Sequence, residues 1–175
     1  LERPVFGFFL GDDAPGELVF GGVSEEHYVG DFHFVDLNSA TYWSAPLQEV
    51  RLADRMRVFA TESAIVDSGT SLVVGPKGEV EALAAMMGAT SLNGYYMIDC
   101  EREVPALTFA IGGRDYTLEK DDLITKWKSL CVLNVDKAAR TTDTWTLSEP
   151  FFRKFYAIFD AAERRVGLAR ARRDS

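Results

Sequence analysis

The chain of 175 residues is long enough to fold as one domain with a sizeable core, and its 47% hydrophobic content argues against an intrinsically disordered protein. A formal net charge of -8 argues against nucleic acid as a partner, because binding to phosphates requires an excess of Lys and Arg. No apolar run is long enough to span a membrane. The chain opens with Leu1 and has no signal-peptide pattern, so we expect a mature or truncated piece.

The first 52 residues alternate between apolar and polar side chains, as is typical of strands, and turn residues separate the apolar runs. A cluster of Gly, Asp and Pro at residues 11–16 predicts a turn between the first two strands. His27 and His33 also lie in this part of the chain. Because no Ser or Cys nucleophile motif accompanies them, we interpret both as surface or edge-strand residues. The predicted strands cover residues 4–10, 17–23, 32–37 and 46–52.

The strongest functional signal lies in residues 64–76, where an apolar run leads into Asp67 and a second apolar run follows. An Asp and a Ser before a Gly form ordinary turns, so a purely structural role is one interpretation. The apolar flanks favour another interpretation, in which Asp67 is a catalytic carboxylate held in a dry, hydrogen-bonded loop. Strands at residues 57–60 and 63–67 are predicted to form the hairpin that delivers this loop.

After this loop, Pro76 is predicted to open a helix that ends at Gly88. Pro150 predicts a second, shorter helix, and Gly112 with Gly113 predicts a hairpin turn. The basic tail from Arg170 to Arg173 is expected to stay solvated. Apolar residues of the first helix recur with helical spacing at Val80, Leu83, Ala84 and Met87, and further strands are predicted at residues 95–100, 106–111, 114–118, 144–147, 155–160 and 165–169.

Cys100 and Cys131 are the chain's two cysteines. They lack the close spacing of a metal-binding knuckle, and with two scattered histidines they do not predict a zinc site. One disulfide is the favoured interpretation, and two buried free thiols are the alternative. A disulfide would indicate an oxidising compartment.

The motif Ile-Val-Asp-Ser-Gly-Thr-Ser-Leu at residues 65–72 resembles the catalytic loop of the pepsin-like aspartic proteases, in the form found in their C-terminal lobe. The closing Trp-to-Ala stretch at residues 145–169 resembles the end of the same lobe, although Ser148-Glu149 replaces the Gly-Asp of the family. If the backbone at Ser148 required a positive φ, the serine would be strained. Residues 4–10 and 105–113 also match, so the resemblance covers the whole chain.

The resemblance implies an all-β fold with minor helices, in which residues 1–175 form a single C-terminal lobe with a double-psi β-barrel-like core. The N-terminal lobe of the bilobal fold is expected to be absent from this chain. Asp67 would be one of two catalytic aspartates that share a proton and hydrolyse peptide bonds. In the supporting loop, Thr70 would hydrogen-bond the outer carboxylate oxygen, Ser68 would contact the other lobe, and Gly69 would let backbone N–H groups reach the carboxylate.

The same resemblance implies that Tyr42, Thr70 and Ser71 contact a peptide or protein substrate, and that Cys100 and Cys131 are bonded. No metal or other cofactor is implied. The expected partner is the N-terminal lobe, and the expected location is the secretory pathway, the extracellular space or an acidic vacuolar or lysosomal compartment.

Two further hypotheses stand beside this one. Two copies of the chain could pair through the Asp67 loop as a homodimeric protease, or the protein could bind peptides without hydrolysing them, a reading that depends on Ser148. In the main hypothesis the isolated lobe is inactive, because the second carboxyl is missing.

Overall fold

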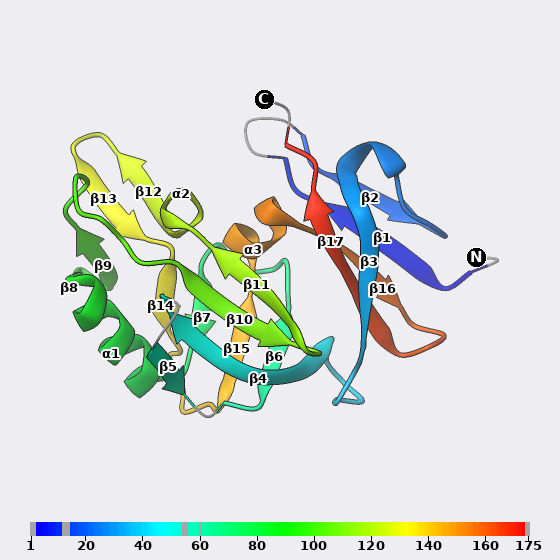
Figure 1. Cartoon of the computed structure of the whole chain (residues 1–175), viewed down its shortest axis with the longest axis horizontal. Coiled ribbons are helices and arrows are strands. Elements are labelled where there is room, and N and C mark those ends of the chain that lie inside the picture. Colours follow the sequence, from blue (N-terminus) through cyan, green and yellow to red (C-terminus); the bar gives the residue numbers. More distant parts are fainter. Residues whose placement is uncertain (1–2, 12–14, 54–55, 60, 174–175) are drawn as a thin grey trace.

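The computed structural model describes residues 3–11, 15–53, 56–59 and 61–173, and for residues 56–59 it describes the backbone alone. Three β-sheets and a few short helices make up this part of the chain (Figure 1). The predicted all-β class with minor helices is therefore confirmed. The predicted turn at residues 11–16 falls partly on residues 12–14, which lie outside the described residues. Within the described ranges, no helix is long and apolar enough to cross a membrane.

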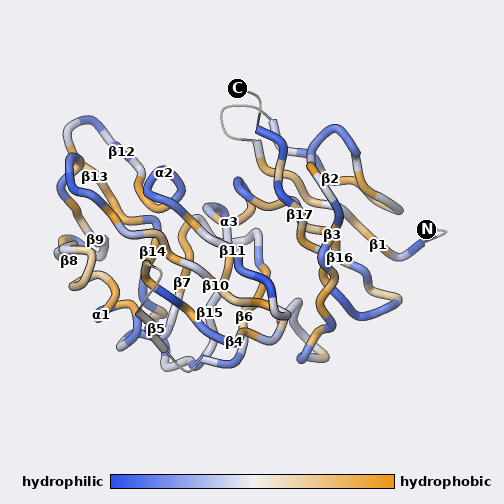
Figure 2. Tube along the Cα trace, viewed as in Figure 1, coloured by the Kyte–Doolittle hydropathy of each residue, from blue (hydrophilic) through white to orange (hydrophobic). Residues whose placement is uncertain are grey.

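A five-stranded sheet at one end of the molecule joins the beginning of the chain to its end (Figure 1). Its central strand β16 is buried at all six positions, and hydrophobic residues run along it in Figure 2. Phe6 stacks on Phe159 with ring centroids 4.7 Å apart, which ties the first strand to the centre of the sheet. In spatial order the strands are β2 (Glu17–Phe20), β1 (Val5–Phe9), β16 (Phe155–Asp160), β17 (Arg165–Ala171) and β3 (Tyr28–Asp36).

An eight-stranded sheet forms the middle of the molecule. Strand β15 lies between β6 and β7, parallel to β6 and antiparallel to β7, so the segment joining β6 to β7 passes the end of β15. In order the strands are β11 (Arg114–Leu118), β10 (Leu107–Ile111), β4 (Ser44–Leu52), β6 (Ser63–Val66), β15 (Thr144–Leu147), β7 (Val73–Gly75) and β14 (Val135–Lys137), with β5 (Met56–Phe59) beside β4.

The predicted hairpin between residues 57–60 and 63–67 is not formed, and residue 60 lies outside the described residues. Strands β5 and β6 instead pair one after the other with the long strand β4. Leu52 of β4 lies opposite Met56, and Ala45 of β4 lies opposite Ala64. Strand β4 is nine residues long, so its backbone has enough hydrogen-bonding groups to pair with two short strands in succession.

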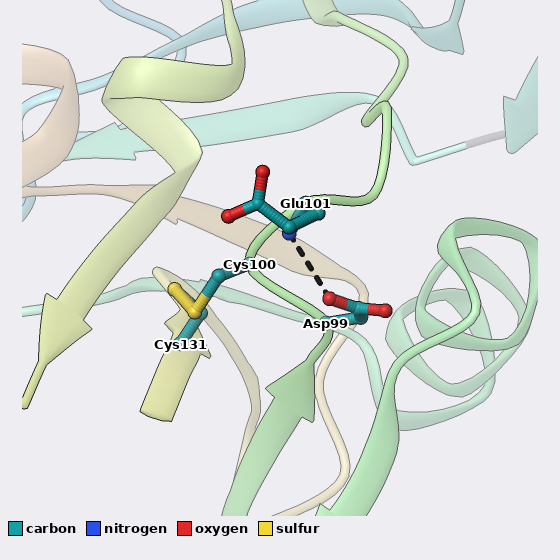
Figure 3. The surroundings of a disulfide bond; sticks show 4 residues. All are labelled: Asp99, Cys100, Glu101 and Cys131. Carbon is teal, nitrogen blue, oxygen red and sulfur yellow. Dashed lines mark hydrogen bonds between the residues drawn. A yellow bond between two sulfur atoms is a disulfide. The ribbon is translucent and has the colours of Figure 1, made fainter. Parts of the chain in front are cut away.

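A four-stranded sheet lies at the other end of the molecule from the five-stranded sheet (Figure 1). The predicted disulfide links Cys100, just after β9, to Cys131 in β13. Figure 3 shows this bond beside a turn in which the Glu101 N–H donates to the Asp99 carboxylate at 3.0 Å. In order the strands are β12 (Ile124–Trp127), β13 (Leu130–Leu133), β9 (Tyr95–Ile98) and β8 (Thr90–Leu92).

The two predicted helices are present in the structure. Helix α1 (Lys77–Met87) starts after Pro76 and ends at Gly88, whose φ of 73° is left-handed. Helix α3 (Glu149–Lys154) has Pro150 in its first turn. The sequence analysis missed α2 (Lys120–Leu123) and the 3-10 turn η1 (Glu25–His27), because four or fewer residues show no helical periodicity. The buried residues of α1 are the predicted Val80, Leu83, Ala84 and Met87.

Trp145 of β15 lies at the centre of the core and is fully buried. Its ring makes an edge-to-face contact with Phe109, with centroids 5.5 Å apart. A Cβ added at Gly75 would lie 2.6 Å from this ring, so the glycine lets β7 approach it. The indole N–H donates to Glu79 of α1 at 2.8 Å. The Trp145 side chain thus links the eight-stranded sheet to helix α1, next to the segment that joins β6 to β7.

Candidate active site

Asp67 follows the last residue of β6, beside the end of β15. Its backbone N–H donates to the Leu147 carbonyl at 3.0 Å. The preceding N–H, of Val66, donates to the Trp43 carbonyl at 2.8 Å on the other side. Asp67 therefore lies where it was predicted to lie, in a loop next to buried strands and close to Leu147.

The far end of the loop is also fixed by the backbone. The N–H of Glu149 donates to the Thr70 carbonyl at 3.3 Å. Leu147 and Glu149, two residues apart, thus hold the loop at Asp67 and at Thr70. Because these bonds join backbone groups, the loop's path depends on the placement of β15 and α3 more than on its own side chains.

The carboxylate of Asp67 receives a hydrogen bond from within its own loop. The Gly69 N–H donates to Asp67 Oδ1 at 2.9 Å. A Cβ at position 69 would lie 3.1 Å from this oxygen, which is closer than most real Cβ contacts, so a side chain there would require the carboxylate to shift slightly. The Gly69 N–H does reach the Asp67 carboxylate, as the resemblance implies.

Two expectations about the loop differ from the structure. The Thr70 hydroxyl donates to the Leu72 carbonyl at 3.4 Å, so the predicted bond from Thr70 to the carboxylate is not formed here. Asp67, Ser68 and Gly69 are exposed, and the predicted dry surroundings are not provided by this chain. The reason is that the loop lies on the surface, beyond the ends of the strands that position it.

The predicted substrate contacts Tyr42 and Ser71 line two separate cavities. Tyr42 is 62% exposed, and it borders a cavity of about 400 Å³ together with Ile65 of the catalytic strand. Ser71 borders a cavity of about 360 Å³ whose other walls come from α2, the start of β12, Asn134, α3 and the segment after β17. Thr70, the third predicted contact, is half-buried between the loop's two ends.

The neighbouring aromatic and histidine side chains have structural contacts. Trp43 packs edge-on against Phe159, with centroids 5.1 Å apart. His27 stacks on Phe9 and pairs with Glu17 at 3.0 Å. The Nδ1 atom of His33 lies 2.8 Å from the Tyr116 hydroxyl, and burial lowers the pKa of this histidine. His33 lies on the edge strand β3 and His27 in the turn η1 that precedes it, in line with the interpretation of both as surface or edge-strand residues.

Ser148 has an extended backbone, with φ of -131° and ψ of -151°. The strain that a positive φ would have caused at Ser148 is therefore absent. The side chain is fully buried, and its Oγ has no hydrogen-bond partner among the described residues. A buried hydroxyl without a partner costs about 1–3 kcal/mol.

A buried ionic cluster near the second cavity was missed by the sequence analysis. The side chains of Lys154 and Asp122 are each 3% exposed, and Lys154 Nζ lies 2.7 Å from Asp122 Oδ2. Arg173 Nη2 lies 2.7 Å from the other oxygen of the same carboxylate. Burial alone would raise the pKa of Asp122, but the hydrogen bonds from Lys154, from the Glu119 backbone and from Arg173 lower it. Arg170, Arg172 and Arg173 of the basic tail are exposed, as expected, and Arg173 in addition pairs with Asp122. No local sequence pattern signals pairs that are 32 and 51 residues apart.

The Asp67 loop thus carries a surface carboxylate held by its own glycine, and it joins β6 to β7, the two strands that flank β15. Among known proteins, the family model described as eukaryotic aspartyl protease matches residues 1–171. The chain belongs to this family, the pepsin-like aspartic proteases.

Curated relatives support the same assignment. The chain is 35% identical over 187 residues to cathepsin D of Chionodraco hamatus, covering 98% of the chain and 47% of the relative. It is 34% identical to human cathepsin D, covering 99% of the chain and 46% of the relative. Cathepsin E of Mus musculus is 33% identical, over 96% of the chain and 46% of the relative. The chain therefore spans about half the length of the curated relatives it matches.

Proposed function

We propose that this chain supplies one of the two catalytic aspartates of an aspartic endopeptidase, and that Asp67 is that residue. The observation that carries the proposal is the exposed Asp67 carboxylate, held at Oδ1 by Gly69 in a loop that is fixed at both ends. Oδ2 has no hydrogen-bond partner in the part of the chain that the structure describes, so it is free to face a second carboxyl.

Two carboxyls so placed share one proton, because their charges cannot both be accommodated at close range. The ionised carboxyl accepts a proton from a water molecule, which attacks the peptide carbonyl carbon. The protonated carboxyl donates its proton to the carbonyl oxygen. Asp67 takes one of these roles, and its exposure leaves room for the partner carboxyl and for the water.

The second carboxyl is proposed to come from an N-terminal lobe that packs over the exposed loop, with Ser68 and Gly69 at the contact. Exposed apolar side chains support a partner at the five-stranded sheet as well. Phe20 on its edge strand β2 is 63% exposed, and Val29 on the opposite edge strand β3 is 53% exposed. Surfaces of this kind are typical of protein interfaces.

The substrate is proposed to be an extended peptide that crosses Asp67. The cavities at Tyr42 and at Ser71 would receive its side chains, and Thr70 would contact its backbone. No metal and no other cofactor is needed for this chemistry, because the two carboxyls supply both acid and base.

The disulfide between Cys100 and Cys131 supports a location in an oxidising compartment, which we propose to be the secretory pathway, the extracellular space or an acidic vacuole or lysosome.

The test is cleavage of a quenched peptide by the complete two-lobed protein with Asp67→Asn. We expect a loss of about 10²–10⁴-fold or more in kcat, because the acid–base group is removed while the side chain keeps its shape. Asp143→Asn, at an exposed carboxylate that lines a different cavity, is the matched control and should keep full activity. Full activity of Asp67→Asn would overturn the proposal.

The homodimer remains the competing arrangement. It predicts that the chain alone has a dimer mass and cleaves the same peptide. The two-lobed arrangement predicts that the chain alone cleaves no peptide, even where its exposed lobe interface makes it dimerise.

A further inference from the structure

We propose that the cavity beside Tyr42 selects a substrate side chain that carries an amide, Gln or Asn, and that Asn38 is the residue that determines this preference. The inference rests on the proposed function, because it concerns the peptide that would cross Asp67. It is carried by the face of the sheet on which the cavity opens, by its uncharged lining and by the hydrogen-bonding groups that the lining still offers.

The cavity opens on the face of the eight-stranded sheet from which the Asp67 side chain emerges. Side chains alternate between the two faces of a strand, and Ala64 and Val66 of β6 point into the core. Ser63, Ile65 and Asp67 therefore share the opposite face, because the pairing with β15 continues through the Asp67 N–H. The first two of these residues border the cavity.

Two walls of the cavity begin beside Asp67. Ile65 is two strand positions before it, a separation of about 7 Å. On the other side, the Trp43 carbonyl accepts from the Val66 N–H at 2.8 Å, which places the neighbouring Tyr42 next to the same strand end. An extended peptide advances about 3.3 Å per residue. A peptide bound over Asp67 can therefore direct a side chain into the cavity from about two positions away from the cleaved bond.

The lining of the cavity favours an uncharged polar group. Among the described residues no charged side chain borders it, and every lining residue except Ile65 carries a hydroxyl or an amide. A carboxylate or an ammonium group would lose hydration there without gaining a counter-ion from the lining. The volume of about 400 Å³ is at the small end for ligand sites, as suits one side chain.

The amide of Asn38 is held in place but is only partly used. Its Nδ2 atom donates to Ser63 Oγ at 2.7 Å, and Ser63 Oγ lies 3.3 Å from Ser44 Oγ. Within the described ranges, Asn38 Oδ1 accepts no hydrogen bond and the hydroxyl of Tyr42 has no partner. The second N–H of the Asn38 amide is also unused. The cavity thus offers one fixed acceptor and two donors.

A second amide complements these groups. A substrate Gln or Asn can donate an N–H to Asn38 Oδ1 and accept from the Tyr42 hydroxyl through its carbonyl oxygen. A substrate Leu of similar size leaves both groups unpaired. Because water can reach these groups before the peptide binds, only the net value of the hydrogen bonds is at stake, which corresponds to a preference of about three- to ten-fold.

The segment that carries Asn38 and Tyr42 is fixed by bonds that do not involve the Asn38 side chain. The Asn38 N–H donates to the Ser44 carbonyl at 2.9 Å, and the Tyr42 N–H donates to Ser39 Oγ at 3.2 Å. The Arg164 guanidinium donates to the Ser39 carbonyl at 3.3 Å. Substitution of Asn38 should therefore change the recognition groups of the cavity and leave its backbone in place.

The experiment uses the complete protein and a peptide library in which each position near the cleaved bond carries Gln, Asn, Leu, Glu or Lys. We expect one position at which Gln or Asn raises kcat/KM by about three- to ten-fold over Leu. Asn38→Leu should abolish this ratio, and Tyr42→Phe should reduce it. Asn93→Gly, at an exposed asparagine with φ of 51° in the hairpin between β8 and β9, is the control that should retain it.

A gain of preference tests the same residue without depending on a loss. Asn38→Asp keeps the shape of the side chain and adds a negative charge, so at the same position Lys should become preferred over Gln by about two- to five-fold, the size that exposed ion pairs produce. A poorly folded variant cannot acquire a new preference. An unchanged order of Gln and Lys in Asn38→Asp would count against the inference.

A library with no preference for Gln or Asn at any position, or a preference that survives Asn38→Leu, would overturn the inference. The failure of the proposed function is recognised separately, because the unmodified protein would then cleave no peptide. In that case the binding of fluorescent Gln and Leu peptides to the Asp67→Asn protein decides. Three- to ten-fold tighter binding of the Gln peptide that depends on Asn38 supports the amide-selective cavity, and equal binding rejects it.

Discussion

The surroundings of the Asp67 loop and the four-stranded sheet are stabilised in different ways. The loop is held by backbone hydrogen bonds to residues that flank Ser148 and lies beside the buried Trp145. The four-stranded sheet lies at the end of the molecule and exposes apolar residues on its outer face, and a disulfide crosses it. Its exposed apolar side chains are Leu92, Tyr95, Trp127 and Leu130.

The difference follows from how much each region buries. Strand β15 has neighbours on both sides and is covered by other elements, so packing alone can fix it. In the four-stranded sheet only alternate residues, such as Ile98 and Leu133, face the core. A region with one buried face gains less from packing, and the covalent link compensates for this.

The largest effect that we expect comes from Trp145→Ala, which should lower the free energy of unfolding by about 3–5 kcal/mol. The substitution leaves a cavity in the core and removes the hydrogen bond to Glu79. Trp127→Ala, at a residue that is 63% exposed, is the matched control and should change stability by less than about 0.5 kcal/mol. Urea denaturation followed by circular dichroism measures both. Equal losses would show that the two regions are not packed differently.

Asp122→Asn should destabilise the fold by about 3–5 kcal/mol, because it leaves Lys154 buried without its main counter-ion. The pKa of Asp122 is lower in the folded protein than its usual 3.8. Its contribution is therefore fully present above pH 3.8 and is lost as the pH falls through the folded-state pKa. Denaturant midpoints should show the variant losing less stability than the unmodified protein on acidification below that value. Parallel pH profiles would contradict this account.

Removal of the disulfide by Cys100→Ser with Cys131→Ser should cost about 2–4 kcal/mol. Hydrogen exchange should quicken in β9 and β13 first, since these are the elements that the bond joins. The amides of Val66 and Asp67 should keep their protection, because their acceptors belong to Trp43, which packs against the core, and to the buried Leu147. Faster exchange at Asp67 before β13 would reverse the comparison.

Ser148→Ala should have the smallest effect, a gain of about 1 kcal/mol, because it removes a buried hydroxyl that has no partner. Ser148→Thr, which keeps the hydroxyl and adds a methyl group to a full site, should destabilise. Thermal denaturation of the two variants distinguishes these outcomes. Destabilisation by alanine would show that the hydroxyl has a partner after all.

Local patterns in the sequence predicted the elements well and their pairing less well. The limits of α1 and its buried stripe follow from Pro76, Gly88 and the helical spacing, all of which are local signals. The turn at Gly112 and Gly113 likewise has positive φ at both residues, as its type requires. The pairing of β5 and β6 with β4 was not predicted, because it depends on which strand is long enough to receive both.

The site shows the same division. The place of Asp67 and the bond from the Gly69 N–H to its carboxylate could be predicted from one short motif. Three features of the site could not be predicted in this way: the hydrogen bond of Thr70, the exposure of the loop and the ion pairs of Asp122. Each depends on residues that are distant in the sequence or on what covers the surface of the chain. The disulfide between Cys100 and Cys131 was favoured by the chain's cysteine count and spacing and implied by the family resemblance, and the structure confirms it.

The central claim is that residues 1–175 provide half of a two-carboxyl site. The most direct test is a quenched-peptide assay from about pH 3 to 7 on the purified, folded chain and on the complete protein. The account predicts no measurable turnover by the chain at any pH and turnover by the complete protein that is fastest at acid pH, lost with Asp67→Asn. Turnover by the chain alone that Asp67→Asn abolishes would contradict it.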